Sequence, residues 1–383
     1  MNRHQQRVKD VLTFFENKDL FLGFRRLLDC AMDTQNMAIY QQAIELTDWK
    51  EKHPNDKETL INRAIDLLEN ISKVNVNEPS TDNYVLHAKQ ITKKYGNHRF
   101  ALGPISLTLR KREVFGLVGE NGNGKTTLLR ILAKELAATS GEINYGFSSP
   151  SYSDYNLKTK LAYIPQRTEK WYGSLMDNLR FVLSSYGENP EEIELRVLMI
   201  VARLGLWNYK HLKWSELSSG YKMRFELART LLRKPEILLL DEPLANLDIL
   251  AQQIILEDLK SIANSVNNPI ALILSSQQLY EVEKISDHVV FLKNGQYNEP
   301  EQNSEETKKS LILELDSNNT REELLEIFAA LPLEKLTFNG GIYLLYFSPE
   351  TTFTEVLLTL GQSKVSMTYI RDISASTRRF FIN

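Results

Sequence analysis

The sequence predicts a central α/β domain, preceded by an all-helical segment and followed by a smaller α+β domain. Three patterns lead to this fold class. Residues 1–76 carry apolar side chains at helical spacing, residues 84–298 alternate short apolar runs with helical patterns, and residues 310–383 show strand and helix patterns in the order βαββαβ. A chain of 383 residues is long enough for two or three such domains.

The helical segment is expected to form about four helices, as a bundle or as two hairpins. Asp33 and Thr34 offer caps for one helix, and residues 53–56 end that helix and cap the next. Residues 75–82 form a linker. The pattern is equally consistent with a partner-docking role and with a purely structural addition. The apolar residues at helical spacing include Leu12, Phe15, Leu20, Phe24 and Leu27.

The central region alternates strands with helices. In two runs apolar and polar residues alternate, which indicates strands with one solvent-exposed face. Three continuous apolar runs indicate strands that are covered on both faces. In order, these runs are residues 85–88, 105–109, 114–118, 237–240 and 271–274. A helical pattern over residues 128–136 follows the third run.

The tail begins after a polar and charged linker at residues 299–309. Its strand and helix patterns follow one another as βαββαβ, which is the order of a ferredoxin-like split unit. The strands are expected at residues 311–315, near 336, at 342–347 and at 365–370, and the helices at 321–331 and 353–360.

The composition narrows the function classes. Hydrophobic residues make up 42% of the chain and charged residues 25%, with a net charge of −3, so no global basic field favours nucleic acid as a partner. The single cysteine, Cys30, allows no intrachain disulfide, which suits a reducing, cytoplasmic compartment. The N-terminus does not resemble a secretory signal. Apolar runs such as residues 237–240 are too short to span a bilayer, so no direct membrane span is expected.

A glycine-rich loop at residues 119–127 reads G-E-N-G-N-G-K-T-T and lies between an apolar strand and a helix. Glycines let backbone N–H groups surround phosphates, and the helix N-terminus adds positive potential. Lys125 would reach the β- and γ-phosphates of ATP, and the Thr126 hydroxyl would bind Mg²⁺. The flanking strand and helix argue against a chance glycine turn. The expected nucleotide-binding residues of this loop are Gly119, Asn121, Gly122, Gly124, Lys125, Thr126 and Thr127.

Two adjacent acids follow the apolar run at residues 237–240. Asp241 can hold the Mg²⁺ shell, and Glu242 can accept a proton from the attacking water. Together with Lys125, Glu242 therefore forms the expected catalytic centre of an ATP-hydrolysing enzyme.

At this point residues 84–298 resemble an ABC-type ATPase domain, which implies a P-loop NTPase fold with an α-helical subdomain. The run L-S-S-G-Y at residues 217–221 is similar to the ABC signature L-S-G-G-Q. Ser218 and Gly220 are kept, whereas Ser219 replaces a glycine and Tyr221 replaces the glutamine. The resemblance implies that this segment caps the ATP bound to a second subunit.

The resemblance implies roles for further residues. Tyr95 would stack on adenine, and Gln166 would sense Mg²⁺ and meet a transmembrane partner. Asp248 would cross the interface between two ATPase subunits. Residues 170–215 resemble the helical subdomain that docks a membrane permease.

One position departs from the family pattern. Gln277 stands where a histidine is usual near the γ-phosphate, and His288 is placed in the next strand, where it should not substitute. A glutamine amide can donate to a phosphate oxygen but cannot carry charge. Two readings stay open, which are a slower hydrolytic step and a tolerated replacement that keeps one hydrogen bond.

The chain carries one phosphate loop and one signature. In this type of ATPase each ATP site combines the phosphate loop of one subunit with the signature of another, so one chain supplies half of each of two sites. The sequence therefore predicts a homodimer that closes around two ATP molecules and drives a separate integral membrane permease. Such a protein lies peripherally on the inner face of the cell membrane. The Ser-Ser-Gly signature resembles that of exporters, which favours export. The alternatives are a soluble ABC ATPase acting on ribosomes or DNA, and a slow regulatory ATPase.

Overall fold

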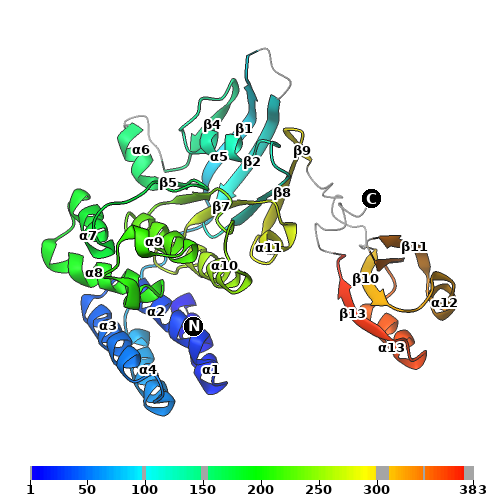
Figure 1. Cartoon of the computed structure of the whole chain (residues 1–383), viewed down its shortest axis with the longest axis horizontal. Helices are drawn as coiled ribbons and strands as arrows, with labels where there is room; N and C mark the ends of the chain where they lie inside the picture. The colour runs from blue at the N-terminus through cyan, green and yellow to red at the C-terminus, as the bar shows by residue number, and fades with distance from the viewer. Residues whose placement is uncertain (1, 97–100, 148–153, 299–309, 340, 375–383) are drawn as a thin grey trace. The chain divides into compact units, whose positions relative to one another are not determined.

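The computed structural model describes residues 2–96, 101–147, 154–298, 310–339 and 341–374. The chain divides into two compact units, Met1–Tyr297 and Asn298–Asn383. The first unit holds the helical segment together with the α/β region, and the second holds the tail (Figure 1). Each unit is described by itself. The finer division at residues 76 and 84 stays a prediction.

Four helices open the first unit, as the sequence predicts. They are α1 (Arg3–Glu16), α2 (Leu20–Asp33), α3 (Met37–Lys52) and α4 (Lys57–Ser72). The side chains of Asn2, Asp19, Asn36 and Asp56 accept hydrogen bonds from the first turns and so cap them. The expected cap at Asp33 was wrong. Its buried carboxylate ends α2 and ion-pairs with Arg7 at 2.7 Å, so it is not free to cap α3.

The central sheet of the first unit has the strand order β5-β6-β7-β3-β8-β9. The first five strands run parallel, and β3, β6 and β7 are buried along their whole length, as their continuous apolar sequences predict. The carboxyl ends of these strands therefore meet at one edge of the sheet. The strands are β3 (Val114–Val118), β5 (Leu161–Ile164), β6 (Ile237–Leu240), β7 (Ala271–Ser276), β8 (His288–Lys293) and β9 (Gln296–Asn298).

A second, antiparallel sheet has the order β2-β1-β4. Its strands are β1 (Tyr84–Lys94), β2 (Ala101–Arg110) and β4 (Ser140–Tyr145). Helix α5 (Lys125–Leu132) buries Leu128, Leu129 and Leu132 in a core shared with both sheets (Figure 1). This packing holds the start of α5 against the end of β3, which is where the phosphate loop lies.

The remaining helices of this unit include a subdomain within residues 170–215. It contains α7 (Leu175–Ser185), α8 (Pro190–Arg203) and two short 3₁₀ helices, Trp207–Tyr209 and Trp214–Glu216. The other helices are α6 (Asp154–Lys160), α9 (Ser219–Leu231), α10 (Ile249–Ala263) and α11 (Leu279–Glu283). Along the described stretches of chain, the length and apolarity that a membrane-crossing helix requires are not combined in any helix.

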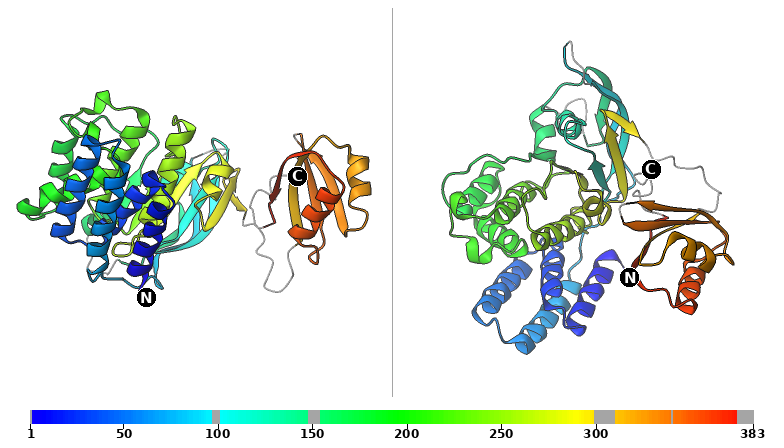
Figure 2. Two further views of the ribbon diagram at one scale, coloured as in Figure 1. Left: turned by 90° about the horizontal axis from the view of Figure 1, so that it is seen from below. Right: turned by 45° about the vertical axis from the view of Figure 1, so that its right-hand side comes forward.

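The N-terminal helices pack against the α/β region. Helices α2 and α3 contact α8, and α2 also contacts α10. The blue helices accordingly lie beneath the green ones in Figure 1 and in the right-hand view of Figure 2. Buried ion pairs join these elements. Arg203 on α8 donates to Asp29 on α2 at 2.5 Å and ion-pairs with Asp258 on α10 at 2.9 Å, and Arg25 on α2 also pairs with Asp258.

The second unit confirms the order βαββαβ. Its elements are β10 (Leu311–Ser317), α12 (Arg321–Ile327), β11 (Leu333–Asn339), β12 (Ile342–Phe347), α13 (Phe353–Gln362) and β13 (Met367–Asp372). The antiparallel sheet has the order β11-β12-β10-β13, with both helices packed on a core that includes Phe328, Phe347 and Leu360. This is the ferredoxin-like arrangement. The linker predicted at residues 299–309 lies outside the described residues.

Candidate ATP site

The phosphate loop turns sharply out of β3. A Cβ on Gly119 would lie 2.5 Å from the carbonyl oxygen of Leu292 on β8, so the loop leaves the sheet where only glycine fits. Gly122 and Gly124 have φ angles of 83° and 96°, which are left-handed, and a Cβ on Gly122 would meet open space. The geometry therefore matches the predicted phosphate cradle, whose backbone can approach a ligand closely.

The side chain of Lys125 is folded inside the loop. It is 5% exposed, and its Nζ donates to the carbonyl oxygens of Gly119 at 2.6 Å and Glu120 at 3.3 Å. The same amine ion-pairs with Glu242 Oε1 at 3.0 Å. Although Lys125 and Glu242 are far apart in sequence, the fold joins the two predicted catalytic residues directly.

The predicted Mg²⁺ ligands are also in contact. Thr126 Oγ1 donates to Asp241 Oδ2 at 2.7 Å, at the end of β6. These are hard oxygen donors, which Mg²⁺ prefers, and a Mg²⁺ held by one or two protein groups completes its shell with water and phosphate oxygens. No three His, Cys, Asp or Glu side chains converge into a metal cluster anywhere in the described ranges. The donor set at Thr126 and Asp241 thus suits a Mg²⁺ bound together with a nucleotide.

Two residues that sequence reasoning missed hold Asp241 in place. Ser275 Oγ, at the end of β7, donates to Asp241 Oδ1 at 2.8 Å and accepts from the Glu242 N–H at 2.8 Å. Tyr163 on β5 donates to Asp241 Oδ2 at 3.4 Å, and burial, followed by the negative charge of Asp241, raises the pKa of its phenol. Ser275 and Tyr163 each lie in a short apolar strand, which is the only signal that the sequence carries for them. The order of the strands in the sheet was needed to place both residues beside Asp241.

Glu242 adopts an uncommon backbone conformation. Its φ of 48° lies in the left-handed region, which costs an L-residue about 1–2 kcal/mol. The N–H of Glu242 is tied to Ser275, and its side chain, 11% exposed, reaches Lys125. Strain of this kind is typical of functional residues, because the surrounding structure must enforce it.

Replacing Ser275 by alanine is expected to lower ATP turnover by about tenfold, because Asp241 and the strained Glu242 each lose a hydrogen bond worth roughly 1 kcal/mol or more. Steady-state ATPase assays at saturating Mg²⁺-ATP measure this. The matched control is Ser106→Ala, which removes an exposed hydroxyl on β2 and should leave turnover unchanged. Full turnover in the Ser275 variant would show that the carboxylates hold their positions without the serine.

A second group of predicted residues forms around the starts of α9 and α10. Ser218 caps α9, and Ser219 Oγ donates to the carbonyl oxygen of Asn246 at 2.9 Å. Asp248 caps α10 by accepting from the Ala251 N–H at 2.8 Å. A Cβ on Gly220 would lie 3.7 Å from the Cβ of Ala251. The signature and the Asp248 loop therefore form one surface, and among the described residues no hydrogen bond or ion pair joins it to the phosphate loop.

Tyr221, the most divergent position of the signature, packs within its own chain. Its hydroxyl donates to that of Tyr209 at 2.8 Å, and the two ring centroids are 3.8 Å apart. Arg224 lies over its ring at 5.4 Å. The side chain therefore couples α9 to the helical subdomain.

Three predicted residues lie around the site without a direct contact to the carboxylates. Tyr95 follows β1 and is 38% exposed. Its hydroxyl oxygen lies 3.5 Å from Thr127 Oγ1. Gln166 follows β5 and Gln277 follows β7, so both belong to the sheet edge that carries Asp241, and both are exposed. His288, by contrast, begins β8 and packs its ring 4.7 Å from that of Phe115, at the amino edge.

Comparisons with known proteins agree with this geometry. The family model described as ABC transporter matches residues 102–245. A phosphonates import ATP-binding protein of Treponema denticola is 30% identical over 55% of this chain and 87% of that protein. A spermidine/putrescine import ATP-binding protein of Mycoplasma mycoides is 32% identical over 57% of this chain and 65% of its own length, so this chain spans less than two thirds of that relative.

Among solved structures, cbiO1 of Clostridium perfringens, part of the ABC transporter complex cbiONQ, superposes with a TM-score of 0.52 at 25% identity. The superposition covers 57% of this chain and 88% of that one. Residues 102–245, which the family model matches, include the phosphate loop, the paired acids and the signature. This chain belongs to the family of ABC transporter ATP-binding proteins.

Proposed function

We propose that this chain is the ATP-hydrolysing subunit of an ABC transporter, with Mg²⁺ as its cofactor. The observation that carries the proposal is the pair of contacts at the carboxyl edge of the sheet. Thr126 lies 2.7 Å from Asp241, and Lys125 lies 3.0 Å from Glu242. The amine of Lys125 for phosphate, the Thr126–Asp241 pair for the metal and the carboxylate of Glu242 as general base thus lie close together at this edge of the sheet. Phosphoryl transfer to water requires such an arrangement.

Each residue has a distinct part in this chemistry. The Lys125 amine, now held by backbone carbonyls and Glu242, would turn to the β- and γ-phosphates of bound ATP. Glu242, once released from Lys125, would accept a proton from the attacking water. Bound Mg²⁺ would supply positive charge to the phosphate oxygens, and Thr126 and Asp241 would hold it.

Dimerisation is proposed because the signature residues make no hydrogen bond or ion pair with the phosphate loop among the described residues of the same chain. The signature surface, formed by Ser218, Gly220 and Asp248, lies apart from the chain's own phosphate loop. Two copies related by a two-fold axis would each supply both halves, so that two ATP molecules are enclosed. A second copy of this chain is therefore the expected ATP-dependent partner.

A separate permease is the expected transport partner, bound through the helical subdomain. This surface exposes two large aromatic side chains, Tyr172 at 80% and Phe181 at 71%, and exposed aromatics favour protein interfaces. Binding there would place the chain peripherally at the inner face of the membrane. The similar proteins include import proteins and a lactococcin transport and processing protein of Lactococcus lactis, so they are compatible with both directions. Export is favoured only by the Ser-Ser-Gly signature.

Affinity purification of the tagged full chain from detergent-solubilised membranes tests the transport role. Recovery of a multi-span membrane protein is expected, and a Phe181→Asp variant should recover less of it because a charge replaces an interface aromatic. The matched control is Phe338→Asp in the second unit, where the phenylalanine is 59% exposed. Recovery of ribosomes or DNA in place of a membrane protein would sink the transporter assignment and leave the ATPase assignment intact.

Changing Gln277 to histidine is expected to leave ATP turnover equal or to raise it by up to about tenfold, since a histidine can donate the same hydrogen bond and also carry charge. Single-turnover hydrolysis of radiolabelled ATP separates this step from product release. Gln278→His, one residue along, is the matched control. A large loss of rate in the Gln277 variant would show that the glutamine has a role of its own.

A further inference from the structure

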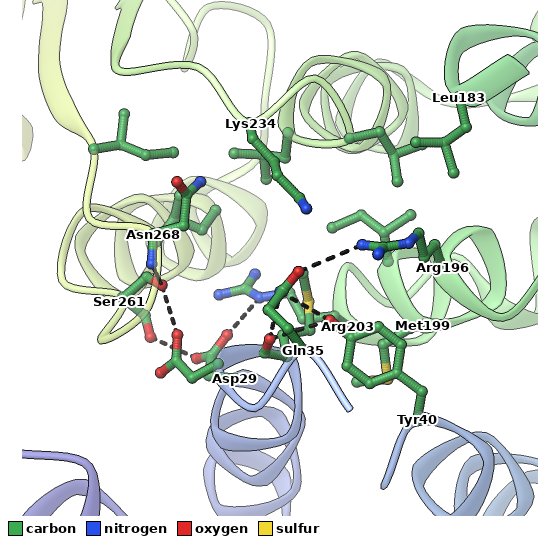
Figure 3. Close-up of a pocket in the computed structure, with 18 of the residues that line it drawn as sticks. Asp29, Gln35, Tyr40, Leu183, Arg196, Met199, Arg203, Lys234, Ser261 and Asn268 are labelled. Carbon is green, nitrogen blue, oxygen red and sulfur yellow. Dashed lines mark hydrogen bonds and ion pairs between the residues drawn. The ribbon is translucent and has the colours of Figure 1, made fainter. Parts of the chain in front are cut away.

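A cavity of the first unit lies where the N-terminal helices meet the α/β region, and none of its lining residues belongs to the phosphate loop or the paired acids. Its volume is about 100 Å³, which is room for several waters or for a small organic molecule. Helix α2, helix α8 and the end of α10 all contribute to its wall (Figure 3).

The cavity is divided into an apolar and a charged part. Its apolar wall includes Leu183, Met199, Ile200, Leu231 and Ile270. Its charged lining consists of Arg7, Arg196, Arg203 and Lys234 against Asp29 and Asp33, so four positive charges face two negative ones and leave a formal excess of two. Pockets with a mostly apolar wall and a few convergent polar groups are typical of small-molecule sites.

Most of these cations are already neutralised by carboxylates. Arg203 pairs with Asp29 and with Asp258, which lies outside the cavity lining, and Arg7 pairs with Asp33 at 2.7 Å. Arg196 is held by Glu192 at 2.8 Å, and its Nη1 donates to Gln35 Oε1 at 3.4 Å.

Lys234 is the exception. Within the described chain its amine has no hydrogen bond or ion pair, and Figure 3 shows it extending from the segment after α9 toward the middle of the pocket. Burial first, and then the charge of Arg196, lower the pKa of this amine, whereas the charges of Glu188 and Glu192 partly offset the shift without forming an ion pair with it. The side-chain amide of Asn268 also borders the cavity without a hydrogen bond to the described residues, and Arg203 Nη2 is buried without a hydrogen-bond acceptor there.

We propose that this cavity binds a small monocarboxylate with an apolar body. The carboxylate would pair with Lys234 and accept from Asn268, and the hydrocarbon part would lie against Met199, Ile200 and Leu231. One unpaired cation matches one negative charge, so a phosphate dianion would bring an excess charge into a largely apolar space. These contacts lie on α8, on α9 and on the segments that follow α9 and α10. The N-terminal helices close the remaining wall of the cavity through residues such as Asp29 and Met32, which gives them a role as part of a second ligand site.

The backbone at Lys234 permits a clean test. Its φ of 50° is left-handed, and its N–H donates to the Leu231 carbonyl oxygen at 3.0 Å as the helix ends. Glycine is preferred in such a turn, so Lys234→Gly should keep or improve the fold while it removes the amine. Lys234→Met instead keeps the length of the side chain. Lys9→Met, an exposed lysine on α1, is the matched control.

Calorimetric titration and thermal melting of the full chain would use propanoate, 4-methylpentanoate and benzoate as probes, with 4-methylpentanamide as the neutral counterpart and inorganic phosphate as the polar anion. We expect one site per chain for at least one carboxylate, with affinity reduced about 10- to 100-fold for the amide and in both Lys234 variants, and unchanged in Lys9→Met. Binding should persist in Lys125→Ala, which separates this site from the nucleotide site. Absence of carboxylate binding, equal binding of the amide, or full affinity in the Lys234 variants would overturn the proposal.

Discussion

Replacing Glu242 by glutamine should lower ATP turnover by about 10²- to 10⁴-fold and should trap a dimer in the presence of ATP. Glutamine has nearly the same size as glutamate, but it cannot accept a proton from water, and it removes the negative charge that pairs with Lys125 at 3.0 Å. ATP binding should therefore persist while hydrolysis stops. Phosphate release assays measure the first effect, and light scattering coupled to size-exclusion chromatography with and without Mg²⁺-ATP measures the second.

The matched control for this experiment is Glu135→Gln. Glu135 is 47% exposed and ion-pairs with Arg130 at 3.5 Å, so its loss should alter neither turnover nor assembly. A Glu242 variant that stays monomeric at saturating ATP would contradict the two-site dimer. A variant that hydrolyses ATP at the unmodified rate would instead remove Glu242 from the catalytic role.

Replacing Arg203 by methionine should destabilise the first unit by about 3–5 kcal/mol, since the change leaves two buried carboxylates without their shared cation. Asp29 and Asp258 are 6% and 0% exposed, and Arg203 itself is 2% exposed. Because α2, α8 and α10 meet at this arginine, the loss should loosen the N-terminal helices from the ATPase region. Urea denaturation followed by circular dichroism measures the change in the free energy of unfolding.

Arg180→Met is the matched control, because it removes an arginine of the same helical subdomain whose ion pair is exposed to solvent. Arg180 on α7 pairs with Glu194 on α8 at 2.7 Å, but the side chains are 41% and 48% exposed, so the expected loss is at most about 1 kcal/mol. If the Arg203 and Arg180 variants lose the same stability, the buried network does not hold these helices together.

The stability of this network should fall in acid. Burial alone raises the pKa of Asp29, but the guanidinium of Arg203, followed by those of Arg7 and Arg26, lowers it below the usual value of 3.8. The unfolded state then binds the proton more readily, so the contribution of Asp29 is complete above about pH 4 and is lost as the pH falls below that value. Denaturation at a series of pH values checks this. The free energy of unfolding should fall less steeply with decreasing pH in Arg203→Met than in the unmodified chain. An equal dependence on pH in both proteins would show that Arg203 does not cause the pKa shift of Asp29.

The predicted chemistry of the ATP site came from local sequence patterns. Residues 119–127 and the pair Asp241-Glu242 each follow a continuous apolar run, and the structure places both at the ends of buried parallel strands. Such motifs are readable because strand, loop and helix are neighbours in the chain, so their geometry depends on few distant contacts. The contacts of Lys125 with Glu242 and of Thr126 with Asp241 then followed once both strands joined one sheet.

Element boundaries and helix caps depended on contacts that no local pattern contains. Asp33 looked like a cap, but Arg7 and the hydroxyl of Ser265, at 2.5 Å, hold its carboxylate at the end of α2. The helix expected over residues 321–331 ends at Ile327, and the next residue, Phe328, leaves the helical conformation with its ring buried in the core of the second unit at 1% exposure. In both cases tertiary packing outweighed the local preference.

The sequence by itself determined the α/β class and the βαββαβ tail, and it predicted ATP chemistry at Lys125, Asp241 and Glu242, since each of these features depends on residues close together in the chain. Only the tertiary structure decided that Ser275 binds both the carboxylate of Asp241 and the backbone N–H of Glu242, because the parallel order β6-β7 brings together strands that are separated by α10. It also decided where the N-terminal helices lie. No pattern in the sequence singled out Asp29 or Arg203, and the two residues form a buried ion pair because α2 and α8 pack together.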